Sequence, residues 1–472
     1  MMQPSAVAGI TIAVLVGYCF TSIDAALNCR GLYADASYYL LKITQTERFL
    51  FNDPARGTVQ VLRQTPVVML RRLTNLGLFE LGQVFSLSML LLPIVLCALC
   101  WPILPQERKS WVIFPVLGLL AGVSASNFAA IGEGAIAASY LWPLLFLFLF
   151  RVEHLVFRIV FLLSCIPALF LHEAALPFML VFLFACAGKY LAASTRAEGI
   201  FLGICATMFL CIIAYETRWI IHPIDVVDRD GYIVGLRQLA FVVAGDRWNL
   251  PLLTGAIALI VLAIVAVLRL ESTSRIAYAG TLVATLIFTA WASFAAIIPW
   301  VSDATFSPFP QYMARNQALF IGSALAAVAV VAFHQKIPAR IWLRPTSLVV
   351  IAALACAQLS WDLAATHHWR VYMADVRSRL ARSEGLISWE QVMALGDADK
   401  NRLWQAMGFG WTMPSFSVVL QSGAPVRSLI AAPKGTSWQP FDPSNVDNLP
   451  RIRGVDYTAY VDAMKAGQGQ SL

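Results

Sequence analysis

Eleven runs of apolar residues dominate this sequence, and most of them approach or exceed the length that a membrane-crossing helix needs. A hydrocarbon core about 30 Å thick requires about 20 helical residues, because each residue adds about 1.5 Å. Within that core backbone amides must be satisfied by the chain itself, so the runs predict helices. They cover residues 6–26, 78–101, 110–127, 135–150, 155–171, 174–190, 198–216, 250–269, 276–299, 317–334 and 345–363.

The composition agrees with this prediction of an all-α polytopic membrane protein. The chain is 59% hydrophobic and only 13% charged, far from the range of soluble domains. Its net charge of +7 comes from residues scattered between the apolar runs, so nucleic-acid binding is not expected. Eight of the nine cysteines lie inside apolar runs, which favours packing over disulfides.

Lysine and arginine collect in alternate loops and so predict the orientation of the chain. The loops with more Lys and Arg per residue are 102–109, 151–154, 188–199, 269–276 and 335–344. By the positive-inside rule these loops are cytoplasmic, which places the N-terminus in the cytoplasm. With eleven spans the C-terminus is then extracytoplasmic. Compact loops and the lack of a retention signal favour a bacterial inner membrane.

Two segments outside the apolar runs have patterns of their own. Loop 30–77 alternates apolar and polar residues at helical spacing, with an interruption at 52–54, and this predicts helices lying along the membrane interface. The tail opens with a helical pattern and continues, at 408–433, through strand-like runs split by Gly and Pro. The expected organisation is a transmembrane domain, 1–363, followed by a small extracytoplasmic α/β region, 364–472.

Asp35 is the most informative acid, because it stands at the predicted membrane boundary within "GLYADASYYLL". An ionisable residue near membrane depth is costly unless it is hydrated, paired or functional. Tyr38 and Tyr39 follow it and can hold the helix at headgroup level. A carboxylate in that position can accept the proton of an incoming hydroxyl or amide. Asp24, near the outer end of the first span, is a second candidate for the base. Its alternative interpretation is a structural one, a polar contact between helices.

The order of these features is similar to that of the GT-C superfamily of membrane glycosyltransferases. The similarity comprises a cytoplasmic N-terminus, an acid soon after the first span ("YADASYYL"), interfacial helices, about eleven spans and an extracytoplasmic C-terminal portion. It implies that Asp35 is the catalytic base and that the donor sugar arrives on a polyprenyl phosphate or pyrophosphate. The implied acceptor is a glycan, lipid or protein. The acidic pair often seen in that superfamily is missing, since alanines flank Asp35. Whether the site uses a divalent metal is therefore left open.

A lipid-phosphate donor needs cations at the outer interface to stabilise the leaving group. Arg315, Arg218 and Arg229 are the candidates, and Arg315 is preferred because no topological role explains it. His172 and Glu173 contain the elements of a metal site or proton relay, but helix capping or packing explains them as well. Glu133 and Glu80 also lie near the predicted outer face. Each can assist the base or form a hydrogen bond to a neighbouring helix.

Two other functions stay open. An oligosaccharide polymerase or ligase would use arginines and a histidine in a large outer loop, and loop 217–249 has Arg218, His222, Arg229, Arg237 and Arg247. A secondary transporter would show internal repeats and charges at mid-membrane, and the sequence has no convincing example of either. No phosphate-binding glycine motif stands in a suitable position, so nucleotide sugars are not expected as direct ligands.

Overall fold

The computed structural model divides the chain into two compact units. Unit 1 contains Met1–Cys19, Asp53–Val59 and Leu92–Trp361, and unit 2 contains Phe20–Asn52, Gln60–Leu91 and Asp362–Leu472. The residues that the structure describes are 4–33, 35–52, 54–126, 133–172, 175–221, 323–324, 326–328, 330–331, 345–397, 401, 404, 407–408, 410–433 and 441–469.

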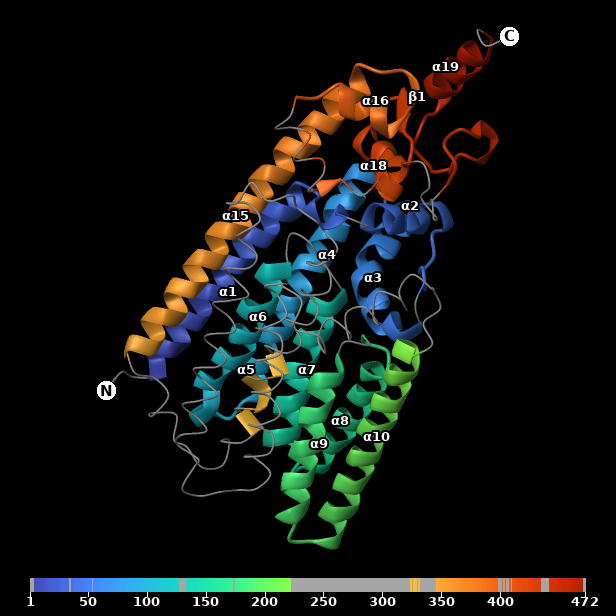
Figure 1. The fold of residues 1–472 in the computed structure, drawn as a ribbon. Coiled ribbons are helices and arrows are strands. Elements are labelled where there is room, and N and C mark those ends of the chain that lie inside the picture. Colours follow the sequence, from blue (N-terminus) through green and yellow to red (C-terminus); the bar gives the residue numbers. More distant parts are fainter. Residues whose placement is uncertain are drawn as a thin grey trace, which may run out of the picture. The chain divides into compact units, whose positions relative to one another are not determined.

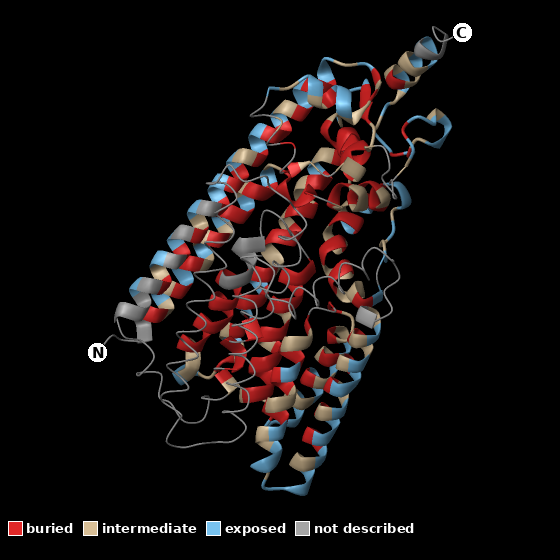
Figure 2. Cartoon of the chain, in the orientation of Figure 1, coloured by how far each residue is buried: buried red, intermediate tan, exposed pale blue. Residues whose placement is uncertain are grey.

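Unit 1 is built from helices that follow one another in antiparallel order (Figure 1). The helices wholly inside it are α5 (Cys100–Ile103), α6 (Ile113–Ser126), α7 (Glu133–Phe150), α8 (Leu155–Ala168), α9 (Leu176–Leu191) and α10 (Arg196–Ile221). Almost all of α7 is buried, whereas α8 and α10 expose apolar side chains such as Leu155, Leu163 and Leu210 (Figure 2). Apolar side chains on an outer surface are the pattern of helices that face lipid.

Four helices of the described chain are long and apolar enough to cross a membrane. They are Val7–Leu27, Leu78–Ile103, Glu133–Phe150 and Arg196–Trp219, and two shorter apolar helices are Leu155–Ala168 and Leu176–Leu191. The predicted helical, membrane-type fold is therefore confirmed at this level. The count of eleven spans stays a prediction, because 250–269, 276–299 and most of 317–334 lie outside the described residues.

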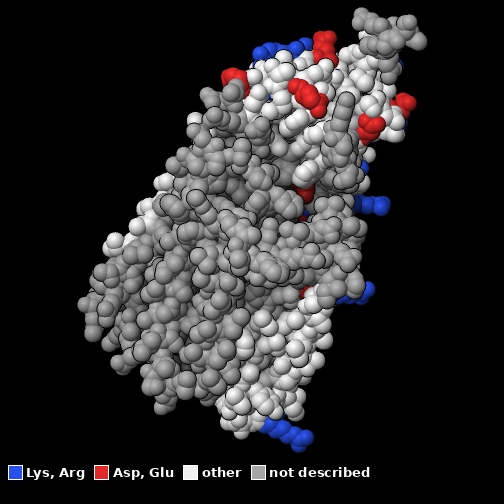
Figure 3. Space-filling model, viewed as in Figure 1, with Lys and Arg blue, Asp and Glu red and all other residues white. Residues whose placement is uncertain are grey.

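Unit 2 combines the ends of long helices with a small α/β region. The long helices α1 (Pro4–Leu27), α3 (Gly57–Leu73), α4 (Leu78–Ala98) and α15 (Pro345–Ala381) contribute to it, together with α2 (Ala36–Thr46). Strands β1 (Gly385–Ile387) and β2 (Ser428–Ile430) pair in parallel, Leu386 opposite Leu429. The helices of the α/β region are α16 (Trp389–Ala394), α18 (Met413–Leu420) and α19 (Thr458–Gly469). Charged side chains gather over this region in Figure 3.

The predicted helices of loop 30–77 are present as α2 and α3. Two details of the tail differ from prediction. The apolar run 345–363 and the helical pattern after it form the single helix α15, because no Pro or Gly interrupts residues 346–381. The run "SFSVVL", read as strand-like, lies in helix α18, where every side chain from Met413 to Leu420 is buried. Short, wholly apolar runs fit a buried helix as well as a strand.

A buried ion pair joins the turn after α1 to α15 within unit 2. Arg30, in the short 3₁₀ turn η1 (Arg30–Leu32), pairs through Nη2 with the carboxylate of Asp362, and both side chains are fully buried. Its Nη1 donates to the Asp362 carbonyl at 2.8 Å and to Thr366 Oγ1 at 2.7 Å. Trp369 Nε1 adds a bond to the Asn28 carbonyl at 2.8 Å. These contacts fix the chain just before Asp35.

Gly31 in the same turn packs directly against α4. A Cβ atom there would lie 2.4 Å from Ser86 Cα, a backbone atom that cannot move aside alone. We expect Gly31→Ala to destabilise the fold by about 1–3 kcal/mol or more through overpacking. Thermal unfolding in detergent measures this, with Gly188→Ala as control, since a Cβ there meets nothing within 4 Å. Equal melting temperatures for the two variants would contradict the packing argument.

Candidate functional site

Asp35 precedes the first residue of α2, and its side chain makes no capping hydrogen bond to the helix. Its Oδ1 instead accepts a hydrogen bond from Trp411 Nε1 at 2.8 Å. The residue is half-exposed. A carboxylate near a helix N-terminus is stabilised in its ionised form by the helix dipole. The carboxylate of this half-buried residue is therefore held in place by an indole.

The C-terminal part of unit 2 positions Trp411. Trp411 lies in the short turn η6 (Gly410–Thr412), immediately before α18, and α18 packs against both α2 and β2. Gly410 is required in this turn, because a Cβ atom there would lie 2.4 Å from Pro433 Cγ. The indole thus reaches Asp35 from a segment 376 residues away in the sequence.

The two predicted tyrosines follow Asp35 in the first turn of α2. Tyr38 and Tyr39 are half-exposed, and their ring centroids are 5.7 Å apart. Burial, and then the negative charge of Asp35, raise the pKa of the Tyr38 hydroxyl. Tyr38 consequently stays protonated at neutral pH. It can offer a hydroxyl donor and a ring face close to the acid.

Two cations that the sequence analysis did not select lie over these rings. The guanidinium carbon of Arg63, in α3, is 4.4 Å from the Tyr39 ring centroid and 5.8 Å from that of Phe85. Lys42 Nζ lies 6.0 Å from the ring centroid of Tyr38. Both distances for the tyrosines fall in the cation–π range. Lys42 follows Asp35 by seven residues, a spacing that places both on one helical face and could have identified it.

Two of the other predicted acids form ion pairs in the structure. Asp24 forms an ion pair with Arg370 of α15, which fits the alternative that it links two helices. Glu133 begins α7 and lies 3.4 Å from Arg56 Nη1, both residues belonging to unit 1. Glu80 is exposed in the first turn of α4.

The predicted phosphate ligands and the His–Glu pair stay predictions. Arg218 is exposed in the last turn of α10 and His172 is buried, and both belong to unit 1. Arg315, Arg229 and Glu173 lie outside the described residues. Among the described residues, Lys42 and Arg63 lie over the rings of Tyr38 and Tyr39, which follow Asp35 in α2.

A divalent metal at Asp35 stays a prediction. Trp411 Nε1 donates to Oδ1, and an ionised carboxylate keeps further lone pairs on its two oxygens. Within the described ranges no group of three or more His, Cys, Asp and Glu side chains is arranged to hold a metal ion.

No family model, curated protein or solved structure matches this chain. The function of the site is therefore argued from its own residues. These are a half-exposed carboxylate, the indole N–H that holds it, and two tyrosine rings covered by cations.

Proposed function

We propose that this protein is a membrane glycosyltransferase. It moves a sugar from a polyprenyl-phosphate-linked donor to an extracytoplasmic glycan, lipid or protein acceptor. Asp35 is the general base. The observation that carries the proposal is the hydrogen bond that Trp411 donates to the carboxylate of the half-buried Asp35, which is followed in α2 by Tyr38 and Tyr39 with cations over their rings.

In the proposed reaction an acceptor hydroxyl oxygen attacks the anomeric carbon of the donor sugar. The bond from that carbon to the phosphate oxygen breaks, and the phosphate leaves with the electron pair. Asp35 takes the acceptor proton, which makes the attacking oxygen more nucleophilic. Lys42, above the ring of Tyr38, supplies positive charge as negative charge grows on the leaving phosphate.

Aromatic rings beside the base suit a sugar substrate. Tyr38 and Tyr39 are half-buried, and the part of each ring that its cation leaves open can pack against the apolar face of a pyranose ring. Arg63 lies against the Tyr39 ring and stabilises the position of that ring. The apolar helices of the chain give the polyprenyl tail a membrane environment in which to approach the site.

Donor turnover tests the proposal directly. The full chain, reconstituted in liposomes, is incubated with polyprenyl-phosphate-linked glucose, galactose, mannose and arabinose, each labelled in the sugar. We expect label to leave at least one donor, either to an added envelope acceptor or to water. Label that stays on every donor, with protein that remains folded throughout, would contradict the proposal.

Trp411→Phe is expected to slow transfer by about tenfold to a hundredfold, because it removes a hydrogen bond to a charged carboxylate and keeps an aromatic ring. The measurement is the initial rate at saturating donor. Trp389→Phe is the matched control, since Trp389 is a half-buried indole of α16 that packs on Trp404. A rate equal to that of the control would show that Trp411 does not orient the base.

The polymerase or ligase alternative depends mainly on residues 222–249, which lie outside the described residues. It stays a prediction, as does the transporter alternative. An Arg229→Ala variant that stops the reaction while Asp35→Asn does not would favour the polymerase or ligase.

A further inference from the structure

Two cations meet beside the short helix α5 in unit 1. Lys109, in the 3₁₀ turn η3 (Gln106–Val112), donates through Nζ to the Trp101 carbonyl. Arg151, directly after α7, donates through Nε to the Ile103 carbonyl at 2.6 Å. Partial burial, and then the positive charge of Arg151, lower the pKa of Lys109, so the two side chains lie close enough to repel each other. The backbone of α5 therefore holds two like charges close together.

No acid of the described chain neutralises these two cations. Within the described residues neither Lys109 nor Arg151 forms an ion pair. The acids nearest to them in sequence, Glu107 and Glu153, are exposed and form no ion pair there either. The two Nη groups of Arg151 make no hydrogen bond to the described chain and are not closed off from solvent. A guanidinium that offers paired donors in this way suits a phosphate group.

Two more cations lie around the end of α7. Arg158 Nε donates at 2.7 Å to a carbonyl of the turn that follows α7, and Lys189 Nζ donates at 3.1 Å to a carbonyl in its last turn. The charges of Glu153 and Glu198 act on Lys189, but neither acid forms an ion pair within the described chain. Positive charge is therefore in excess around this end of α7.

Exposed apolar side chains adjoin the cations. Leu155 and Val156 begin α8, four and five residues after Arg151, and are 71% and 67% exposed. Leu99, directly before α5, is 48% exposed. In helices of this apolar character such side chains face lipid. A soluble anion would leave them uncovered, whereas a phospholipid places a phosphate and apolar chains side by side.

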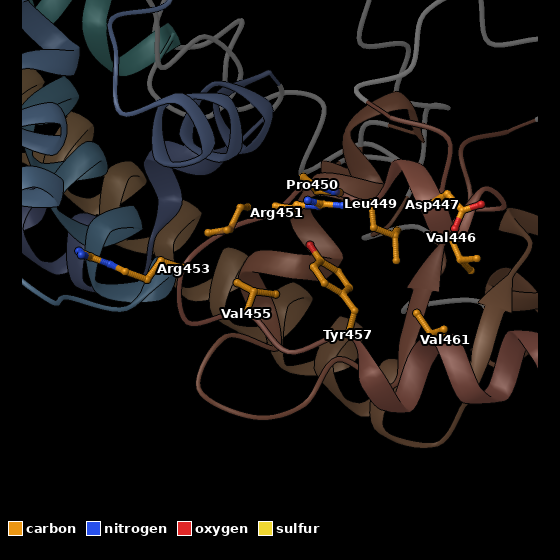
Figure 4. A pocket seen from close by; sticks show the side chains of 10 residues that line it. Val446, Asp447, Leu449, Pro450, Arg451, Arg453, Val455, Tyr457 and Val461 are labelled. Carbon is orange, nitrogen blue, oxygen red and sulfur yellow. The ribbon is translucent and has the colours of Figure 1, made fainter.

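The arginines at the end of α3 in unit 2 are arranged differently. Arg453 extends from the open depression shown in Figure 4 to α3, where its Nη2 donates to the carbonyls of Arg71 at 3.2 Å and Thr74 at 2.9 Å. Arg71 in turn pairs with Glu47 at 3.6 Å. An acid thus accompanies the arginines there, while Lys109 and Arg151 have none in the described chain.

We propose that Lys109 and Arg151 bind the headgroup phosphate of an anionic phospholipid. The Nη groups of Arg151 donate to two phosphate oxygens, and the ammonium of Lys109 adds positive charge beside them. The acyl chains lie along exposed apolar side chains such as Leu155. Basic sites between helices at a membrane surface are a setting in which anionic headgroups bind.

Lipid binding to the purified full chain in a neutral detergent, followed by native mass spectrometry, tests the proposal. We expect phosphatidylglycerol to bind about tenfold more tightly than phosphatidylcholine, whose choline brings another positive charge to the cations. Arg151→Gln and Lys109→Gln should each weaken phosphatidylglycerol binding by about tenfold, because each removes a charged donor. The matched control is Arg196→Gln, an exposed arginine of unit 1 at the start of α10, which should leave binding unchanged.

Melting temperatures separate binding from folding. Each variant is measured without lipid and then with phosphatidylglycerol, so a folding defect appears before lipid is added. Arg151→Lys keeps the charge but loses the paired donors, and its stabilisation by phosphatidylglycerol should fall between those of the wild type and Arg151→Gln. Equal binding of phosphatidylglycerol and phosphatidylcholine would overturn the proposal. So would a loss in Arg196→Gln as large as in Arg151→Gln, which indicates diffuse attraction, or equal stabilisation by glycerol 3-phosphate, which indicates a soluble anion.

Discussion

Asp35→Asn is expected to lower sugar transfer by about 10²- to 10⁴-fold, the range that general-base catalysis contributes. Asparagine keeps a carbonyl oxygen that can accept the hydrogen bond from Trp411 Nε1, so the local geometry should survive. What it loses is the ability to take a proton at neutral pH. Initial rates at saturating donor measure the effect, with rates normalised to the folded protein recovered from size-exclusion chromatography.

Asp24→Asn is the matched control for this prediction. Asp24 is also a half-exposed acid of unit 2, but Arg370 already occupies its carboxylate. We expect its transfer rate to stay within a few-fold of the wild type, because an exposed ion pair contributes about 0–1 kcal/mol. If Asp24→Asn stops transfer and Asp35→Asn does not, the base is Asp24 and the assignment of Asp35 is wrong.

Asp362→Ala is expected to lower the free energy of unfolding by about 3–5 kcal/mol, because it leaves the fully buried Arg30 guanidinium without its counter-charge. The loss should appear as a lower thermal midpoint in detergent and a lower yield of folded protein. The exposed pair Asp24–Arg370 provides the comparison, and Arg370→Ala should cost at most about 1 kcal/mol.

A double variant distinguishes the buried charge from the volume that is lost. Arg30→Met with Asp362→Leu removes both charges and keeps much of the apolar volume. Replacing a buried pair in this way is often neutral or stabilising, so we expect a midpoint well above that of Asp362→Ala. A double variant as unstable as the single one would show that the pair stabilises unit 2 through its hydrogen bonds to Thr366 and the Asp362 carbonyl.

Helices were the predictable part of this fold. A run of about 20 apolar residues has few structural options in a membrane, which is why α1, α4, α7 and α10 fall where hydropathy places them. The interfacial helices α2 and α3 followed from their alternating faces. Segments outside the membrane lack this constraint, so their secondary structure was harder to predict. The run "SFSVVL" is apolar throughout, so its spacing could not separate helix α18 from a strand.

The candidate site was predictable only where it is local in sequence. Tyr38 and Tyr39 follow Asp35 by three and four residues, so the sequence alone indicated that they lie near the acid on one interfacial helix. Trp411 is held against Asp35 by the packing of α18 on α2, a tertiary contact with no periodic signal. Arg63 is a similar case, because an arginine in an amphipathic helix is expected on the wet face, and here it is buried against Tyr39.

The claim that Asp35 faces extracytoplasmic water is tested most directly by labelling at position 35. In a chain whose nine cysteines are replaced, Asp35→Cys is treated with a membrane-impermeant maleimide in intact cells. Lys109→Cys, in the predicted cytoplasmic loop 102–109, is the control and should be labelled only after permeabilisation. We predict that position 35 is labelled in intact cells. Labelling of position 35 only after permeabilisation would contradict the proposed glycosyltransferase site.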